Sequence, residues 1–152
     1  MAPAIVHFLV GAAILLVLAA PIALRYDLGR TWPLWLVIVG GLWGLFPDIH
    51  HIAPAYESHL RTLHDSPWAD LFAFHYTLDR PAVRTRYTES VFLSILLFVG
   101  ATVTYTIGDA LGDRRTVDDD FALPLSATIL VAGLGTLLIG TVLVGAQSVP
   151  VS

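Results

Sequence analysis

Long runs of apolar residues set the strongest limit on how this chain can fold. Four such runs cover residues 4–24, 32–46, 90–107 and 121–146. A bilayer core of about 30 Å is crossed by roughly 20 helical residues, so the first, third and fourth runs are long enough to span it. The second run, of about 15 residues, is short for a span, so either residues 29–31 and Pro47 extend it, or it sits in a thinned bilayer or tilted against its neighbours. We therefore predict an all-α, multi-pass protein of the cell membrane, a single membrane domain (1–152) with about four transmembrane helices and a short amphipathic helix.

Composition supports a membrane protein and narrows its chemistry. The sequence is 56% hydrophobic and 13% charged, which is typical of integral membrane proteins. The first run has no basic segment before it and no small-x-small cleavage site after it, so we expect a permanent helix and not a removable signal. Without cysteine, a transition-metal site must use histidine. The chain has no basic stripe for nucleic acid, and its Arg-only basic residues and acidic Asp118 to Asp120 run suggest a halophilic source.

The segment Phe-Pro-Asp-Ile-His-His, residues 46–51, places one carboxylate and two imidazoles where the second apolar run ends. Two crossings return the chain to the side on which it began, so the polar segment 47–89 should emerge beside His7. All the histidines then gather at one membrane surface: His7, His50, His51, His59, His64 and His75. Asp oxygen and neutral His nitrogen bind Zn²⁺ and other first-row divalent ions. We predict a divalent-metal site there, with Zn as the first expectation and Mn or Fe as alternatives.

Candidate ligands differ in how well their positions suit a shared ion. The main candidates are His7, Asp48, His51 and His64, and the weaker ones are His50, Asp70, His75 and Asp79. Each has a structural alternative, because a histidine at a helix start can anchor at the interface and an aspartate can cap exposed backbone. Glu57 is the nearby glutamate that could act as a general base. We expect Asp118 to Asp120 to form a solvated loop.

A second helix signal lies inside the polar segment. Ser66 followed by Pro67 is typical of a helix start, because the hydroxyl can cap and proline suits the first position. Residues at helical spacing follow on one face: Trp68, Leu71, Phe72, His75 and Asp79. We predict a short amphipathic helix that ends before Pro81. His75 and Asp79 are four residues apart, so they could bind one ion or each other.

Glycine spacing predicts close packing of the first two helices. Gly40 and Gly44 form a small-xxx-small pair, which lets a neighbouring helix approach and would bring His7 toward Asp48. Arginines do not decide the orientation, because equal numbers fall on the two sides of the predicted topology. One side carries Arg61, Arg80, Arg84 and Arg86, and the other carries Arg25, Arg30, Arg114 and Arg115.

These motifs together resemble the membrane-bound metal-dependent hydrolases, a family related to the LexA-regulated inner-membrane proteins. In that family a His followed by Gly opens the first helix, a Leu-Pro-Asp-Ile-Asp-His-type motif ends a later one, and a His-Arg-Gly-x-Thr-His-Ser-type motif follows. His7 with Gly11 matches the first motif, and residues 46–51 match the second with His50 in place of its second aspartate. His64 matches the start of the third.

The third motif departs furthest from the family pattern. Asp65-Ser66 stands in place of Arg-Gly, and Ala69 stands where the second histidine is expected. Asp70 or His75 could replace that histidine as a ligand. The resemblance covers residues 3–80 and implies a metal-dependent hydrolase.

Two functions remain open at this point. The first is a metal-dependent hydrolase that cleaves a phosphoester or related ester at the membrane interface, with a lipid-like substrate suggested by location alone. The second is a non-catalytic membrane protein in which the His-rich face holds a structural metal or docks a partner. An open coordination position would favour the first, and a closed four-ligand cage or dispersed side chains would favour the second. Substrate, orientation and oligomeric state are not fixed by the sequence.

Overall fold

The structure, a computed structural model, describes residues 2–117, and in that range every regular element is helical. The elements in order are α1 (Ala4–Ala23), α2 (Trp32–Leu45), the 3-10 helix η1 (Phe46–His51), α3 (Glu57–His64), the 3-10 helix η2 (Pro67–Leu71), α4 (His75–Leu78), α5 (Pro81–Arg84) and α6 (Tyr87–Val117). The all-α prediction is thus confirmed there. The predicted fourth span, 121–146, and the predicted loop Asp118 to Asp120 lie outside the described residues.

Within residues 2–117, three helical segments are long and apolar enough to cross a membrane, which is compatible with a membrane location. They cover Ala4–Ala23, Trp32–His51 and Tyr87–Gly112. The second reaches this length because η1 continues α2 past Pro47, which agrees with the predicted extension at that end. Large apolar side chains remain exposed along α2 and α6, among them Leu34, Leu42, Phe92 and Val103. Faces of this kind suit contact with lipid, since a bilayer core offers no partners for polar groups.

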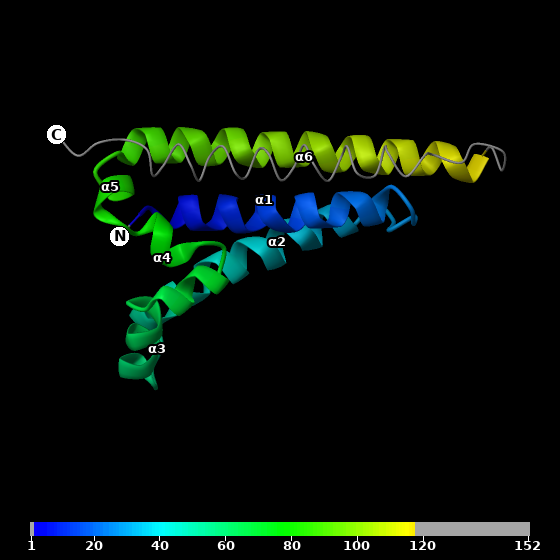
Figure 1. Ribbon diagram of the computed structural model, residues 1–152. Helices are drawn as coiled ribbons and strands as arrows, with labels where there is room; N and C mark the ends of the chain where they lie inside the picture. The colour runs from blue at the N-terminus through cyan, green and yellow to red at the C-terminus, as the bar shows by residue number, and fades with distance from the viewer. Residues whose placement is uncertain (1, 118–152) are drawn as a thin grey trace.

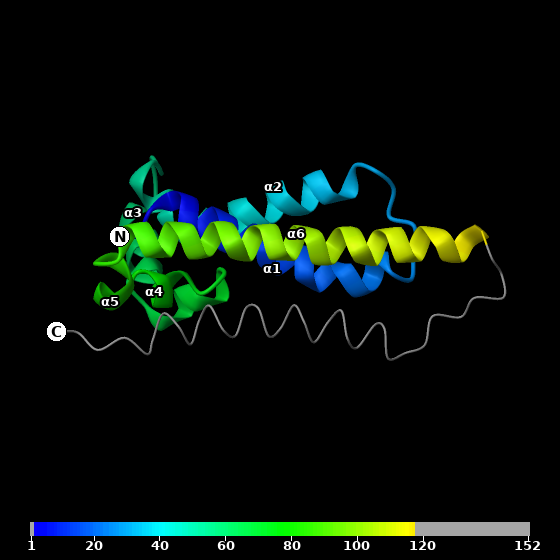
Figure 2. The same cartoon turned by 90° about the horizontal axis from the view of Figure 1, so that it is seen from above.

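Helix α1 packs against both α2 and α6, as Figure 1 and the view from above in Figure 2 show. Its buried face is rich in small residues, including Ala12, Ala13 and Ala20, which allow both neighbours to approach. The start of α1 and the short helices α3, α4 and α5 lie at one end of this arrangement (Figure 1). The polar segment is therefore folded over the end at which α1 begins.

The predicted glycine contact between α1 and α2 is confirmed. A Cβ atom added at Gly11 would lie 2.2 Å from the carbonyl oxygen of Gly40, and one at Gly44 would lie 2.3 Å from that of His7. Only glycine leaves room for backbone to meet backbone at such distances. This contact places the end of α2 directly beside His7.

Replacing Gly44 by Leu should therefore separate the two helices and destabilise the fold. Overpacking of a tight contact costs about 1–3 kcal/mol, and here the obstacle is backbone that cannot turn aside. Thermal unfolding of the detergent-purified protein, followed by circular dichroism, should show a lowered midpoint. Val39→Leu adds bulk to the exposed face of the same helix and is the matched control. An unchanged midpoint for Gly44→Leu would contradict the close contact.

The predicted amphipathic helix from Ser66 to Pro81 is wrong as a single element. Ala73 and Phe74 have φ values of 55° and 60°, in the left-handed region that ends a helix, so η2 and α4 are separate turns. The Ser66 hydroxyl donates to the carbonyl of Leu63 (2.8 Å) and does not cap η2.

The break between η2 and α4 has a local cause. The carboxylate of Asp70 accepts hydrogen bonds from the backbone N–H and the hydroxyl of Thr77, at 2.7 and 2.8 Å. These bonds satisfy a donor in the first turn of α4, where the helix has no partner of its own. Because the chain turns before α4, His75 is fully buried, whereas Trp68 on η2 stays 70% exposed.

Candidate metal centre

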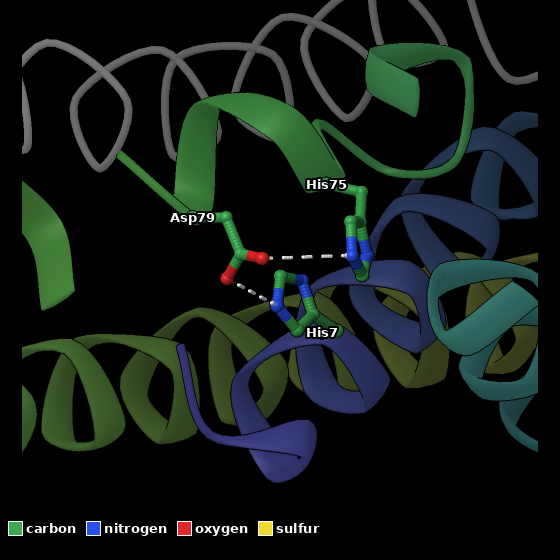
Figure 3. A group of neighbouring side chains, drawn as sticks. All are labelled: His7, His75 and Asp79. Carbon is green, nitrogen blue, oxygen red and sulfur yellow. Dashed lines mark hydrogen bonds and ion pairs between the residues drawn. The ribbon is translucent and has the colours of Figure 1, made fainter. Parts of the chain in front are cut away.

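Histidines and aspartates from separate segments converge at the end where α1 begins. In the described part of the chain, two groups of three are compact enough to hold a metal ion, and in each group one ligand atom per residue lies within 4.8 Å of the others. The first contains His7, His75 and Asp79, and the second contains Asp48, His64 and His75. Figure 3 shows the first group, with the Asp79 carboxylate directed at both rings. The two groups share His75, which is therefore the centre of the cluster.

Distances from His64 and His75 to Asp48 and Asp79 resemble those between ligands of one ion. The Nε2 atoms of His64 and His75 each lie 3.4 Å from Oδ1 of Asp48. Oδ2 of Asp79 lies 3.2 Å from the His64 Nε2 atom and 3.9 Å from that of His75. Ligands about 2.0–2.1 Å from a tetrahedral zinc ion are separated from one another by about 3.3 Å. The separations of 3.2–3.4 Å are close to this value, and that between Asp79 Oδ2 and His75 Nε2 is longer.

The facing atoms of this group lack hydrogen bonds. Oδ1 of Asp48 and the Nε2 atoms of His64 and His75 are buried, and none makes a hydrogen bond with correct geometry within residues 2–117. A buried polar atom without a partner is costly and needs an explanation. A cation at their common centre would satisfy all three at once.

The opposite ring nitrogens of these histidines are already occupied. Nδ1 of His75 donates to the carbonyl of Gly44 (3.1 Å), and Nδ1 of His64 donates to the Asp65 carboxylate (3.0 Å). With the proton on Nδ1, the lone pair of Nε2 points into the cluster. Metal-binding histidines usually show this arrangement, in which a carbonyl or carboxylate fixes the ring from behind. The packing of Gly44 against α1 thus also orients His75.

Charge in the cluster favours a cation. Burial opposes ionisation of Asp79, but hydrogen bonds from His7 and from the backbone N–H of Ala2 lower its pKa to about 2. Burial likewise disfavours the charged form of His75, yet its contact with the Asp48 carboxylate raises the pKa of His75 above its ordinary value. Asp79 is therefore a carboxylate at neutral pH. Because a metal ligand must be deprotonated, binding of a divalent ion would compete with protonation of His75.

The structure brings some of the predicted ligands together and leaves others outside the cluster. His7, Asp48 and His64 belong to the two groups, together with His75 and Asp79 from the weaker candidates. His51 lies outside both groups, on the exposed side of η1, with its ring 3.9 Å from that of His50. Glu57 pairs with Arg61 (3.2 Å) on the exposed face of α3, and Asp70 is engaged by Thr77.

His50 takes an intermediate position. It is buried, its Nδ1 donates to the carbonyl of Pro47 (2.9 Å), and its ring centre lies 4.7 Å from that of His64. It thus supports the ring of His64 from the side, without belonging to either group of potential ligands.

A cleft of about 440 Å³ adjoins the cluster. His64 and Asp79 line it from the side of the candidate centre, and three arginines line it elsewhere: Arg61, Arg80 and Arg84. Among the potential ligands, His64 and Asp79 line this cleft, and their side chains are 10% and 12% exposed. A small molecule in this cleft would lie directly beside His64 and Asp79.

No protein-family model, curated protein or solved structure matches this chain. Fold and site still define a class: an all-helical protein, over the part described, with membrane-span-type helices and buried His/Asp groups that could hold a metal ion.

Proposed function

We propose that this protein is a membrane-bound metal-dependent hydrolase that cleaves a phosphoester or related ester at the membrane interface. Asp48, His64 and His75 hold the ion, which is zinc by first preference. The observation that carries the proposal is the set of three buried ligand atoms that make no hydrogen bond within residues 2–117 and lie beside a cleft lined by His64.

The ligand set suits a catalytic ion. Catalytic zinc sites use three protein ligands, commonly histidines with a carboxylate, and leave a position for water or substrate. When bound, such an ion lowers the pKa of a coordinated water to about 7 and polarises a phosphoryl or carbonyl oxygen. Zn²⁺ fits two imidazoles and a carboxylate well, and Mn²⁺ or Fe²⁺ can occupy such sites.

Neighbouring residues hold this set in place. Asp79 has a pKa of about 2, far below the value near the working pH that an efficient general base needs, so it orients His7 and His64 and adds negative charge. Glu57, paired with Arg61 on an exposed helix face, is not positioned against the cluster.

A structural metal site is the second candidate. Structural zinc sites are closed by four protein ligands. The proximity of Asp79 Oδ2 to both His64 and His75 supplies a fourth ligand for such a cage. The cleft beside His64 and Asp79 favours the open, catalytic arrangement.

Activity assays separate these two functions. The detergent-purified protein should hydrolyse p-nitrophenyl phosphate, bis-p-nitrophenyl phosphate or p-nitrophenyl esters, lose this activity in a chelator and regain it with Zn²⁺ or Mn²⁺. His64→Ala should lower the hydrolysis rate by at least about 100-fold, because removing a metal ligand has a larger effect than removing a residue that only hydrogen-bonds to a ligand. His59→Ala, on the exposed face of α3, is the control. If the protein retained its metal but hydrolysed none of these esters, the result would contradict the hydrolase and support a structural metal site.

A further inference from the structure

The cleft beside the candidate metal centre has a second chemical character. It is lined by guanidinium groups as well as by cluster residues, with Arg61 from α3 and Arg80 and Arg84 from the two ends of α5. Three cations around one cleft are expensive to hold together unless an anion or a carboxylate neutralises them.

Carboxylates account for only part of this charge. Arg61 pairs with Glu57 at 3.2 Å, whereas neither Arg80 nor Arg84 forms an ion pair with any carboxylate in the described range. The two acidic residues that line the cleft are already engaged, Asp65 by His64 and Asp79 by His7. Within residues 2–117, Arg80 and Arg84 are therefore the cationic groups of this cleft that no carboxylate neutralises.

Helix α5 holds these two arginines in register. The backbone N–H of Arg84 donates to the carbonyl of Arg80 (3.0 Å), and both residues line the same cleft. The guanidinium of Arg80 lies over the ring of Tyr76, 5.6 Å from its centre, which restrains it beside the cleft. Two guanidinium forks on one turn suit the several oxygens of a phosphate group.

We propose that Arg80 and Arg84 form a phosphate-binding subsite next to the metal centre, which receives the phosphate of a phosphomonoester substrate. This inference rests on the proposed function and names its substrate class. The negative charge of Asp65 and Asp79 opposes an anion in the same cleft, and a bound divalent ion would offset it. Phosphate should therefore bind more tightly to the metal-loaded protein than to the stripped one.

The phosphate could belong to a lipid or to a water-soluble ester. Helix α5 has a second side, where Val83 lines a smaller apolar cavity of about 70 Å³ with Val6, Val10 and Leu93. An amphiphile could place its phosphate at Arg84 and begin its acyl chain at Val83. Both sources share the same headgroup chemistry, so the binding experiment must tell them apart.

Isothermal titration of the full chain in detergent provides the test. The probes are inorganic phosphate, glycerol 3-phosphate and dihexanoyl phosphatidic acid, each with the Zn-loaded and the chelated protein. For the Arg80→Gln/Arg84→Gln double variant we expect the phosphate Kd to rise by at least about 10-fold with unchanged zinc content, since each guanidinium makes a charge-assisted contact. Arg25→Gln/Arg30→Gln, at the other end of α1, is the matched control and should stay within about two-fold.

The outcomes separate this subsite from the metal centre. Zinc binding without measurable phosphate binding, or an equal loss in both double variants, would overturn the subsite and leave the hydrolase proposal standing. Phosphate binding that depends on Arg80 and Arg84 in a protein that takes up no metal would support the subsite and overturn the proposed function. Tighter binding of dihexanoyl phosphatidic acid than of glycerol 3-phosphate would show that the phosphate belongs to a lipid. Equal affinity for the two would show that it belongs to a water-soluble ester.

Discussion

Protein purified in detergent without chelator should contain about one divalent ion per chain, and His75→Ala should remove it. His75 belongs to both groups of potential ligands, and its Nε2 atom lies 3.4 Å from Asp48. Its loss therefore leaves no complete group. We expect the affinity for Zn²⁺ to fall by at least about 100-fold, more than for the loss of a supporting contact alone. Mass spectrometry of the metal content after gel filtration measures this directly.

His51→Ala is the informative control for that experiment. The motif in residues 46–51 pairs Asp48 with His51 as ligands, whereas the structure pairs Asp48 with His64 and His75. His51→Ala should keep its metal. If this variant lost the ion while a folded His75→Ala retained it, the motif would describe the site better than the structural grouping does. Matching circular dichroism spectra would exclude loss of the fold as the cause.

The difference between motif and structure has a physical reason. Apolar runs and the Gly40/Gly44 spacing predict the helices and the contact that brings η1 beside His7, because both signals act along a single helix. The polar segment 47–89 has no apolar periodicity that continues along its whole length. The spacing of residues 66–80 predicts one amphipathic helix, yet the chain turns at Ala73 and Phe74.

That turn decides which histidine becomes central. The sequence offers Asp70 as a possible metal ligand, but its carboxylate accepts hydrogen bonds from Thr77 and fixes the start of α4. The turn then buries His75 against Gly44, 31 positions away in sequence. The i,i+4 spacing of His75 and Asp79 was the available signal for this pair. Its importance depends on the tertiary contact, which spacing alone does not contain.

Zinc should raise the thermal stability of the wild-type protein, and a chelator should lower it. An ion that binds only the folded state at 100 times its Kd adds about 2.7 kcal/mol, which corresponds to about 5–10 °C in the unfolding midpoint for a chain of this size. The physical reason lies in the cluster itself. Without a cation, Asp48 and Asp79 face the same imidazole of His75, and three buried ligand atoms have no hydrogen bond in the described chain.

Asp48→Asn tests whether the ion or a network of ion pairs stabilises the cluster. The variant keeps the shape of the side chain and removes its charge, so in a metal site its unfolding midpoint should no longer respond to zinc or chelator. If the cluster is a network of ion pairs without metal, Asp48→Asn still weakens the contact with His75. The variant would then be less stable than the wild type by the same amount in Zn²⁺ and in chelator, and the wild-type midpoint would not differ between these two solutions. Differential scanning measurements on both proteins, each with Zn²⁺ and with chelator, therefore separate the two explanations. A zinc-dependent midpoint that survives unchanged in Asp48→Asn would show that Asp48 is not a ligand and would move the ion to the group of His7, His75 and Asp79.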